Sequence, residues 1–230
     1  LRGGADIVVA TTGRLLDLLQ HNALKFDALQ TLVLDEADKM LSLGFSEELA
    51  QVLAALPKKR QNLLFSATFP PELEQLIASL LHNPVGINLA KQDENLIEQH
   101  VYTLEAERKN AALIHLIKTG DWQQVLVFAS AKNTCNRLVL KLEKAGIQAA
   151  AFHGDLSQSA RNNALADFKA KHIRVLIATD VAARGIDIQQ LPYVVNFDLP
   201  RSANDYIHRI GRTGRAGQQG YAIALICPDE

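Results

Sequence analysis

Short apolar runs rich in β-branched residues alternate along the chain with longer segments in which apolar residues recur every three or four positions. The short runs predict strands, at Ile7–Ala10, Thr31–Leu34, Asn62–Ser66, Val85–Leu89, His100–Leu104, Val125–Ala129, Ala149–His153, Arg174–Ala178, Tyr193–Phe197 and Tyr221–Ile226. The longer segments predict helices, over Gly13–Gln20, Ser46–Ala55, Pro71–Leu81, Ala106–Lys118, Ala131–Ala145, Ser157–Lys169 and Ser202–Arg212. Pro71 suits the first turn of its helix, and Ser157 and Ser202 suit the N-caps of theirs.

Several predicted strands are apolar at every position, for example Leu32-Val33-Leu34 and Val125–Phe128. Strands buried on both faces have this pattern, which is typical of a parallel sheet covered by helices. Regular alternation of strands and helices therefore predicts an open α/β fold with mostly parallel sheets. The polar stretch Ala90–Asn95 predicts a linker over residues 90–97, with one α/β unit at residues 1–89 and a second at residues 98–230.

The composition excludes several protein classes. Hydrophobic residues make up 48% of the chain and charged residues 21%, which is typical of a globular protein and not of a disordered or collagen-like one. Lys and Arg number 24 against 25 Asp and Glu, so a nucleic-acid partner would have to be met by a local basic patch. The two cysteines, Cys135 and Cys227, form no disulfide framework, so we expect a reducing, cytoplasmic location. No apolar run approaches the roughly 20 residues of a membrane helix, and we expect no membrane partner.

Acidic side chains follow the predicted strand at residues 31–34, namely Asp35, Glu36 and Asp38. In nucleotide hydrolases a carboxylate at a strand end holds Mg²⁺ on the phosphates, because this hard ion takes oxygen ligands. A neighbouring Glu can orient and deprotonate an attacking water. The alternative is the acidic first turn of a helix, where carboxylates complement the helix dipole.

Two further segments follow predicted strands. Ser66-Ala67-Thr68 carries hydroxyls that could relay a hydrogen bond from a phosphate, although a capped turn is the simpler interpretation of these residues alone. The loop Thr179–Asp187 holds two Asp, one Arg and one Gly. Gly lets a ligand approach the backbone, Asp can bind a ribose hydroxyl and Arg can bind a phosphate, with a charged turn as the alternative.

The segment His208–Arg215 contains three arginines, Arg209, Arg212 and Arg215, spaced by three residues. On a helix such residues drift only slowly around one face. Arg binds phosphate bidentately and can stabilise the charge that develops on a transferred γ-phosphoryl group. A solvated basic face is the alternative, and Ile210 with the glycines counts against it.

Weaker signals lie at Gly3-Gly4, Thr11–Arg14 and Gln158–Arg161, where small or amide side chains meet a cation at a helix start. Helix N-termini bind phosphate without reading base identity, but each tetrad alone is more typical of an ordinary helix start. Trp122 is the only tryptophan, and we expect no stacking platform around it.

In this order and spacing the motifs resemble those of the DEAD-box family of ATP-dependent RNA helicases, and the resemblance covers essentially the whole chain. Asp35–Asp38 is similar to the motif that names the family, Ser66–Thr68 to its SAT motif and Val125–Ser130 to its fourth motif. Further matches are Gly3-Gly4, Thr11–Arg14, the QxxR element Gln158–Arg161, and the fifth and sixth motifs Thr179–Asp187 and His208–Arg215. Bacterial RhlE-type members look nearest.

The sequence departs from the family pattern in two respects. Thr12 stands where the family has Pro, which adds a backbone N–H and loosens φ, and we expect RNA contact to survive. No GxxxxGK[ST] phosphate loop and no adenine-recognising Gln motif occur in the chain. The resemblance therefore implies tandem RecA-like domains of which the first is incomplete, and we expect this chain alone to lack ATPase activity.

The resemblance also implies a mechanism in which ATP binds between the two domains and drives local RNA strand separation and remodelling of RNA–protein complexes. Asp35 and Glu36 would hold Mg²⁺ and the water, with Glu36 as base, Asp187 would bind the ribose, and Arg212 and Arg215 would act as arginine fingers. Coupling residues would be Asp38, Ser66, Thr68 and His208. RNA would be bound through its backbone by Gly4, Thr12, Gly13, Arg14, Gln158, Arg161, Thr179, Arg184 and Gly185.

Two other functions stay open. One is a non-catalytic module that binds RNA or partner proteins, which the missing phosphate loop favours for this chain. The other is a DNA helicase of the same superfamily, which the combination of Asp35–Asp38 with Ser66–Thr68 disfavours. For the helicase we expect a monomer, with ribosome-assembly or RNA-decay proteins as partners.

Overall fold

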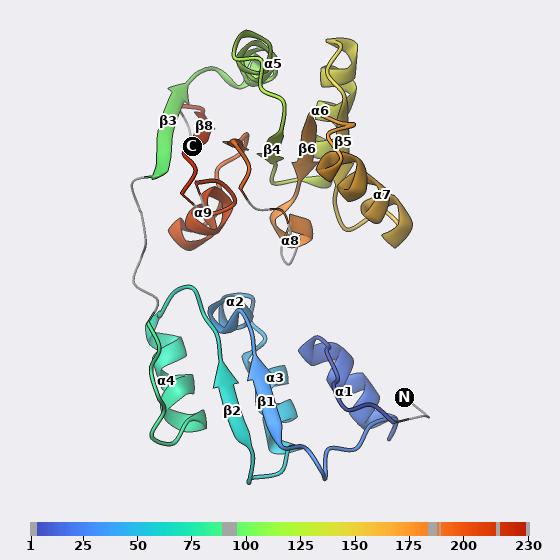
Figure 1. The fold of residues 1–230 in the computed structure, drawn as a ribbon, viewed down its shortest axis with the longest axis vertical. Helices are drawn as coiled ribbons and strands as arrows, with labels where there is room; N and C mark the ends of the chain where they lie inside the picture. The colour runs from blue at the N-terminus through green and yellow to red at the C-terminus, as the bar shows by residue number, and fades with distance from the viewer. Residues whose placement is uncertain (1–3, 89–95, 184–187, 189, 215–216, 229–230) are drawn as a thin grey trace. The chain divides into compact units, whose positions relative to one another are not determined.

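The computed structural model describes residues 4–88, 96–183, 188, 190–214 and 217–228. The chain divides into two compact units, Leu1–Asn88 and Leu89–Glu230 (Figure 1). The predicted linker at 90–97 lies mostly outside the described residues, and at its end Ile97 already belongs to a strand. None of the helices in the described parts of the chain is long and apolar enough to cross a bilayer.

The first unit contains a two-stranded parallel sheet with four described helices. In chain order its elements are α1 (Thr12–Gln20), β1 (Thr31–Leu34), α2 (Ala37–Ser42), α3 (Ser46–Ala54), β2 (Gln61–Leu64) and α4 (Pro71–Leu80). β1 and β2 pair in register from Thr31 opposite Gln61 to Leu34 opposite Leu64. Leu34, Leu49 and Leu80 form the buried core, with leucines of β1, β2, α3 and α4 packed around them.

Two predictions for this unit are wrong. Val33 of β1 is 53% exposed and its partner Leu63 in β2 is also exposed, because the described core packs against the opposite face of the sheet. The structure has no strand over Ile7–Ala10 or over residues 85–88, and the side chains of Ile7, Val9, Val85 and Ile87 are among the most exposed apolar groups described. A strand needs a neighbour for its hydrogen bonds, and among the described residues β1 and β2 pair only with each other.

The second unit is a six-stranded, all-parallel sheet in the order β3-β8-β7-β4-β6-β5. The strands are β3 (Ile97–Thr103), β4 (Val125–Phe128), β5 (Ala149–Phe152), β6 (Val175–Ala178), β7 (Tyr193–Asn196) and β8 (Gly220–Ile226). A 3₁₀ turn, η2 (Ala106–Arg108), leads into α5 (Lys109–Thr119), followed by α6 (Lys132–Lys144), α7 (Gln158–Lys169), α8 (Asp180–Ala183) and α9 (Ala203–Ile210). The predicted open α/β fold is therefore confirmed.

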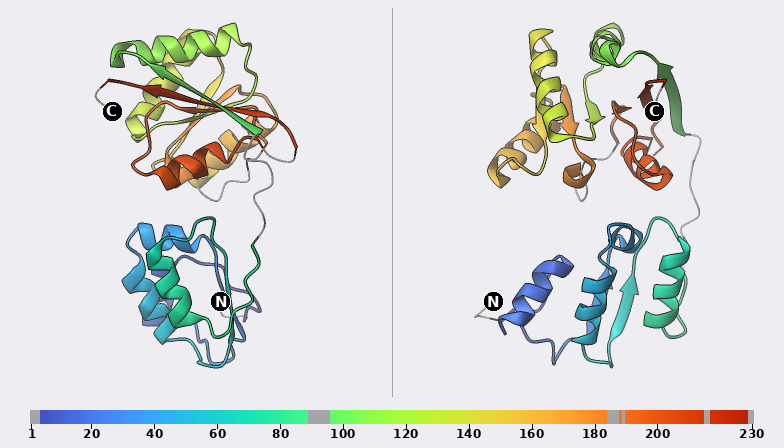
Figure 2. Two further views of the ribbon diagram at one scale, coloured as in Figure 1. Left: turned by 90° about the vertical axis from the view of Figure 1, so that its left-hand side faces the viewer. Right: turned by 180° about the vertical axis from the view of Figure 1, so that it is seen from behind.

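Helices cover both faces of this sheet. On one face Val125, Val127 and Ile177 pack against apolar residues of α5 and α6. On the other, Leu126 and Leu176 pack against residues of α7 and α8. Figure 2 shows α5 and α9 on opposite sides of the strands. Every residue of β4 and β6 is buried, as the apolar runs predicted.

The predicted helix boundaries hold to within a few residues. The hydroxyls of Ser157 and Ser202 accept N-cap hydrogen bonds from the backbone, and Pro71 lies in the first turn of α4, as predicted. The helix predicted over Ser202–Arg212 ends two residues early, at Ile210, with Gly211 as its C-cap. The parallel strands of each sheet all end at one edge, and the candidate residues follow several of these ends.

Candidate functional site

The first cluster lies where β1 ends. Asp35 and Glu36 are both exposed, and the Glu36 N–H donates to Asp35 Oδ1 at 2.9 Å. Glu36 adopts the left-handed conformation, with φ 50° and ψ 46°, and caps α2. Non-glycine residues rarely adopt this conformation, and it is enriched at functional sites. The sharp turn takes the chain from strand to helix within two residues and leaves both carboxylates at the surface.

The end of β2 lies beside this turn through Asp38 and Thr68. Asp38 is buried, and its Oδ2 accepts a hydrogen bond from Thr68 Oγ1 at 2.5 Å. Ser66 Oγ donates to the Thr68 carbonyl at 2.7 Å, and the Ala37 N–H donates to the Phe65 carbonyl at 3.1 Å. The structure thus brings Asp38 together with Ser66 and Thr68, although Asp38 precedes Thr68 by 30 positions in the chain. The acidic segment follows β1 and begins α2. The predicted magnesium site at a strand end and the alternative of an acidic first helical turn are therefore compatible.

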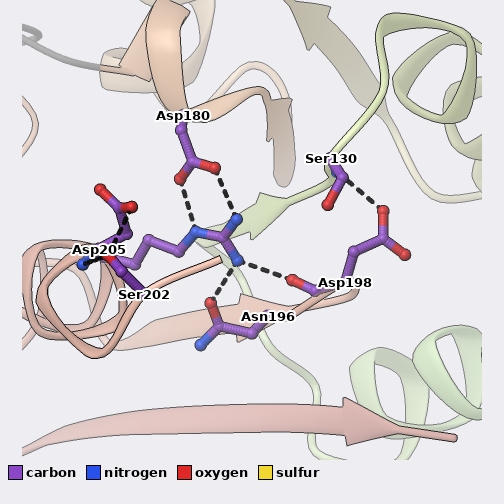
Figure 3. A network of polar contacts seen from close by, with 7 residues as sticks. Ser130, Asp180, Asn196, Asp198, Ser202 and Asp205 are labelled. Carbon is purple, nitrogen blue, oxygen red and sulfur yellow. Dashed lines mark hydrogen bonds and ion pairs between the residues drawn. The ribbon is translucent and has the colours of Figure 1, made fainter. Parts of the chain in front are cut away.

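In the second unit a buried arginine joins the ends of three strands. Arg209 is 2% exposed, and its Nε and Nη2 donate to the two carboxylate oxygens of Asp180 at 2.6 and 2.7 Å (Figure 3). Its Nη1 donates to Asn196 Oδ1 at 2.9 Å and to the Asp198 carbonyl at 2.7 Å. The guanidinium also lies 5.0 Å from the centre of the Phe128 ring. Such bidentate, charge-assisted contacts are strong and directional, so they hold α9 firmly against β4, β6 and β7.

The same network continues to Ser130, whose N–H donates to Asp198 Oδ2 at 2.8 Å (Figure 3). Asn196 is fully buried, and its Nδ2 has no hydrogen-bond partner. At the start of α9, Ser202 accepts from the Asp205 N–H and donates to the Asp205 carboxylate. The buried Arg209 guanidinium is paired at Nε, Nη1 and Nη2, and because a buried charge needs such partners, these contacts favour one arrangement of the strand ends.

The expectation that the three arginines share one helical face is wrong. Arg209 meets Asp180 inside the unit, and Arg212 lies in the turn after α9 because the helix ends at Ile210. The Arg212 carbonyl accepts from the Leu191 N–H at 3.1 Å, and Thr213 Oγ1 donates to the Leu191 carbonyl, so this turn is fastened to the start of β7. His208 is half-buried on α9 in this unit, whereas Arg215 lies outside the described residues.

The residues proposed to bind RNA lie at helix starts and strand ends. Thr12, Gly13 and Arg14 form the first turn of α1, which Thr11 caps, and Arg14 pairs with Asp17 at the surface. On α7, Arg161 Nη2 donates to Gln158 Oε1 at 2.7 Å, while the buried Arg161 Nε has no hydrogen-bond partner. Thr179 is buried after β6, and Gly4 adopts a positive φ of 78°. Arg184, Gly185 and Asp187 lie outside the described residues.

Comparison with known families identifies the family of this chain. Residues 1–76 match the profile of the DEAD/DEAH box helicases, and residues 108–217 match that of the helicase conserved C-terminal domain. The chain belongs to the DEAD-box helicase family. The ATP-dependent RNA helicase DBP3 of Meyerozyma guilliermondii is 42% identical over 231 residues, with 98% of this chain and 43% of DBP3 covered. RhlB of Pseudomonas syringae is 42% identical over 229 residues, with 98% and 58% covered.

Solved structures agree with this assignment. The structure of S. cerevisiae Dbp5 bound to RNA and ADP BeF3 matches with a TM-score of 0.84 and 35% identity, covering 96% of this chain and 59% of that one. The likeness to DEAD-box helicase structures supports the RecA-like fold. These two relatives come from a yeast and a bacterium, so they support membership of the DEAD-box family at large and leave the RhlE-type resemblance approximate. The chain spans about half the length of these relatives.

Sequence reasoning missed the partners of Arg209 in this DEAD-box chain. A signal was present, since Asn196 ends a strand that is otherwise apolar and Asp198 follows two residues later. It also treated Trp122 as isolated. The Trp122 ring stacks on Tyr193 at 4.4 Å between centroids, Tyr193 on Tyr221 at 5.4 Å, and Tyr221 on His100 at 6.3 Å. Tyr193, Tyr221 and His100 come from the neighbouring strands β7, β8 and β3, so the row could not be seen along the sequence.

Proposed function

We propose that the protein is an ATP-dependent RNA helicase, in which RNA-stimulated ATP hydrolysis drives local strand separation. The observation that carries this proposal is the turn at Asp35-Glu36, which presents two exposed carboxylates and is joined through Asp38 to Thr68. The hydrogen bond between Thr68 and Asp38 directly links the segment after β2 to the segment after β1, which would bind phosphate. The relatives named ATP-dependent RNA helicases, and the RNA and nucleotide in the Dbp5 structure, support it.

Asp35 and Glu36 fit a magnesium ion that accompanies ATP. Both offer carboxylate oxygens, the ligands that Mg²⁺ prefers, and both are exposed at a strand end. Within the described residues no group of three or more His, Cys, Asp or Glu side chains could form a complete metal cage. Mg²⁺ commonly takes one or two carboxylates and fills its other positions with phosphates and water. When bound, the ion would neutralise charge on the β- and γ-phosphates.

The protein side chains would then divide the chemistry between the two units. Glu36 would accept a proton from the attacking water, and Asp38 with Ser66, Thr68 and His208 would couple hydrolysis to domain movement. Arg212 would stabilise the charge that develops on the transferred phosphoryl group. We assign the same role to Arg215 and ribose binding to Asp187, both of which lie outside the described residues. Because carboxylates and cations come from different units, turnover would require both units to meet ATP.

RNA would be bound through its sugar–phosphate backbone. The helix starts at Thr12–Arg14 and at Gln158–Arg161 supply N–H groups and guanidinium groups, which bind phosphate without reading bases. Thr179, Gly4, Arg184 and Gly185 complete the proposed set. Binding of this kind is independent of sequence and weakens as salt rises. We propose that the protein is a cytoplasmic monomer and that its partners are ribosome-assembly or RNA-decay proteins.

The test is ATP turnover with and without single-stranded RNA, in the 230-residue chain and in the whole protein that its gene encodes. We expect the whole protein to hydrolyse ATP in an RNA-stimulated manner and the 230-residue chain to be inactive, because it contains no phosphate loop. Glu36→Gln should abolish turnover and leave nucleotide-dependent RNA binding, since it removes the base and keeps the shape.

Other outcomes would contradict this proposal. Normal turnover in Glu36→Gln would show that Glu36 is not the base. RNA binding by the whole protein without any turnover would identify a non-catalytic RNA-binding module. Equal stimulation by single-stranded DNA would favour a DNA helicase.

A further inference from the structure

The first strand after the predicted linker is tied to α9 and to the turn that follows it. β3 is an edge strand that pairs along its whole length with β8. Gln99 Oε1 accepts a hydrogen bond from the Tyr206 hydroxyl at 2.9 Å, which joins β3 to α9. Glu98 Oε2 accepts from Gln219 Nε2 at 3.1 Å, just beyond the same turn. The start of β3 therefore contacts the chain on both sides of Arg212.

The closest of these contacts is at Gly214. This residue has a φ of +61°, and a methyl group placed on it would overlap Ile97 Cγ1 and approach the Leu96 carbonyl oxygen to 3.1 Å. On its other side, Gly220 at the start of β8 leaves just enough room for the Thr213 hydroxyl. Thr213 is fully buried and donates to the Leu191 carbonyl. The Thr213–Gly214 turn is thus enclosed by the starts of β3, β7 and β8.

We propose that Leu96 and Ile97 position Arg212, so that a displacement at the end of the linker is passed through the Gly214 turn to this arginine. Only Thr213 separates Gly214 from Arg212, whose own carbonyl is held by Leu191. Ile97 is half-buried, and its Cγ1 lies where a methyl group on Gly214 would be, so a shift of Ile97 toward the turn would press on Gly214. Leu96 and Ile97 are also the first described residues after the segment that joins the two units. The position of the start of β3 would in this way control how Arg212 meets ATP, an inference that rests on the proposed function.

Gly214→Ala tests the contact, and Gly217→Ala is its matched control. Gly217 also has a positive φ, +77°, but a methyl group there would meet no atom within 4 Å. Both variants carry the same kind of backbone strain, and only the first pushes against Ile97. In the whole protein we expect Gly214→Ala to lower the RNA-stimulated kcat by about 10- to 100-fold, since ~1 Å misplacement of a catalytic group can have an effect of that size. The KM for ATP should change little, because Arg212 would stabilise charge that develops only in the transition state.

Ile97→Ala in the Gly214→Ala background tests whether the overlap is the cause. It removes Cγ1 and leaves only the Leu96 carbonyl and the backbone strain, so a large part of the original kcat should return. Ile97→Ala alone should also lower kcat, but by less than Gly214→Ala does, because it removes the contact without pushing the turn. Its kcat sets the upper limit of the recovery in the double variant. Each kcat is expressed per folded molecule, measured by circular dichroism, so that partial unfolding is not mistaken for mispositioning.

Amide hydrogen exchange in the 230-residue chain gives a readout that does not depend on ATP. Gly214→Ala should speed exchange over residues 203–214, Ile97→Ala should reverse this in the double variant, and Gly217→Ala should leave it unchanged. If the wild-type whole protein shows no RNA-stimulated turnover, the proposed function fails while exchange still decides whether β3 restrains the turn. Equal effects of Gly214→Ala and Gly217→Ala, or no recovery in the double variant, would overturn the inference.

Discussion

In β6 all residues are buried, whereas in β1 burial alternates and Val33 is 53% exposed. Both strands are apolar in sequence, and both pair in parallel with a neighbour. The difference lies in what covers them, since apolar helix residues pack on both faces of the six-stranded sheet and on one described face of the two-stranded one. An apolar run therefore predicts which strand side chains can be buried, and the helices packed on the sheet determine which of them are buried.

The largest expected effect tests this difference directly. Leu176→Ala in β6 should lower the free energy of unfolding of the second unit by about 3 kcal/mol, because a fully buried side chain is replaced by a cavity. Val33→Ala in β1 should change the free energy of unfolding of the first unit by no more than about 0.5 kcal/mol, as at other exposed positions. Urea unfolding followed by circular dichroism measures both. A similar loss at the two positions would mean that Val33 is covered in solution.

A second pair of substitutions compares a buried and an exposed arginine. Arg209→Met should destabilise the second unit by about 3 kcal/mol, because it leaves Asp180 and Asn196 without their partner in a buried site. Arg14→Met removes only a surface ion pair with Asp17 and should change stability by no more than about 0.5 kcal/mol. The same urea experiment measures these variants. Arg209→Lys should fall between them, since an ammonium cannot make the bidentate contact; full stability in Arg209→Met would contradict the role assigned to the network.

The smallest expected effect concerns the thiol of Cys135, which is buried in the core of the second unit. Burial, with a smaller contribution from the Asp198 charge, raises the pKa of Cys135 from 9.0 to about 12. The neutral thiol is therefore favoured by folding, so its contribution to stability is complete below pH 9 and is lost as pH rises towards 12. In the folded chain Cys135 should resist iodoacetamide while the half-buried Cys227 serves as the internal reference. Mass spectrometry of the alkylated chain checks this, and rapid labelling of Cys135 at pH 8 would show that the core opens.

The second unit could be predicted closely from the sequence because its signals are local. Continuous apolar runs correspond to β4 and β6, and the hydroxyls of Ser157 and Ser202 cap the helices that they precede. The segments Ile7–Ala10 and Val85–Leu89 carry the same local signal without forming described strands. Strand formation depends on a hydrogen-bonding neighbour far away in the chain, which a local pattern does not report.

The candidate site shows the same limit. The nearness of Asp38 to Thr68 was expected from the family resemblance, and nothing in either segment alone required it. The three-residue spacing predicts that Arg209 shares a helical face with the other two arginines. It does not, because Asp180, 29 positions before it, holds Arg209 inside the unit and Gly211 ends the helix. The contact between Ile97 and Gly214 likewise joins residues that are distant in sequence and adjacent only in the folded sheet.

The row of stacked rings has a practical consequence for optical experiments. Trp122 is the only tryptophan of the chain, and it is buried against Tyr193 in the second unit. Fluorescence excited selectively at the indole therefore arises from the second unit alone. Unfolding of the first unit would be silent in that signal, so emission and far-ultraviolet dichroism recorded on one sample would separate the melting of the two units without any label.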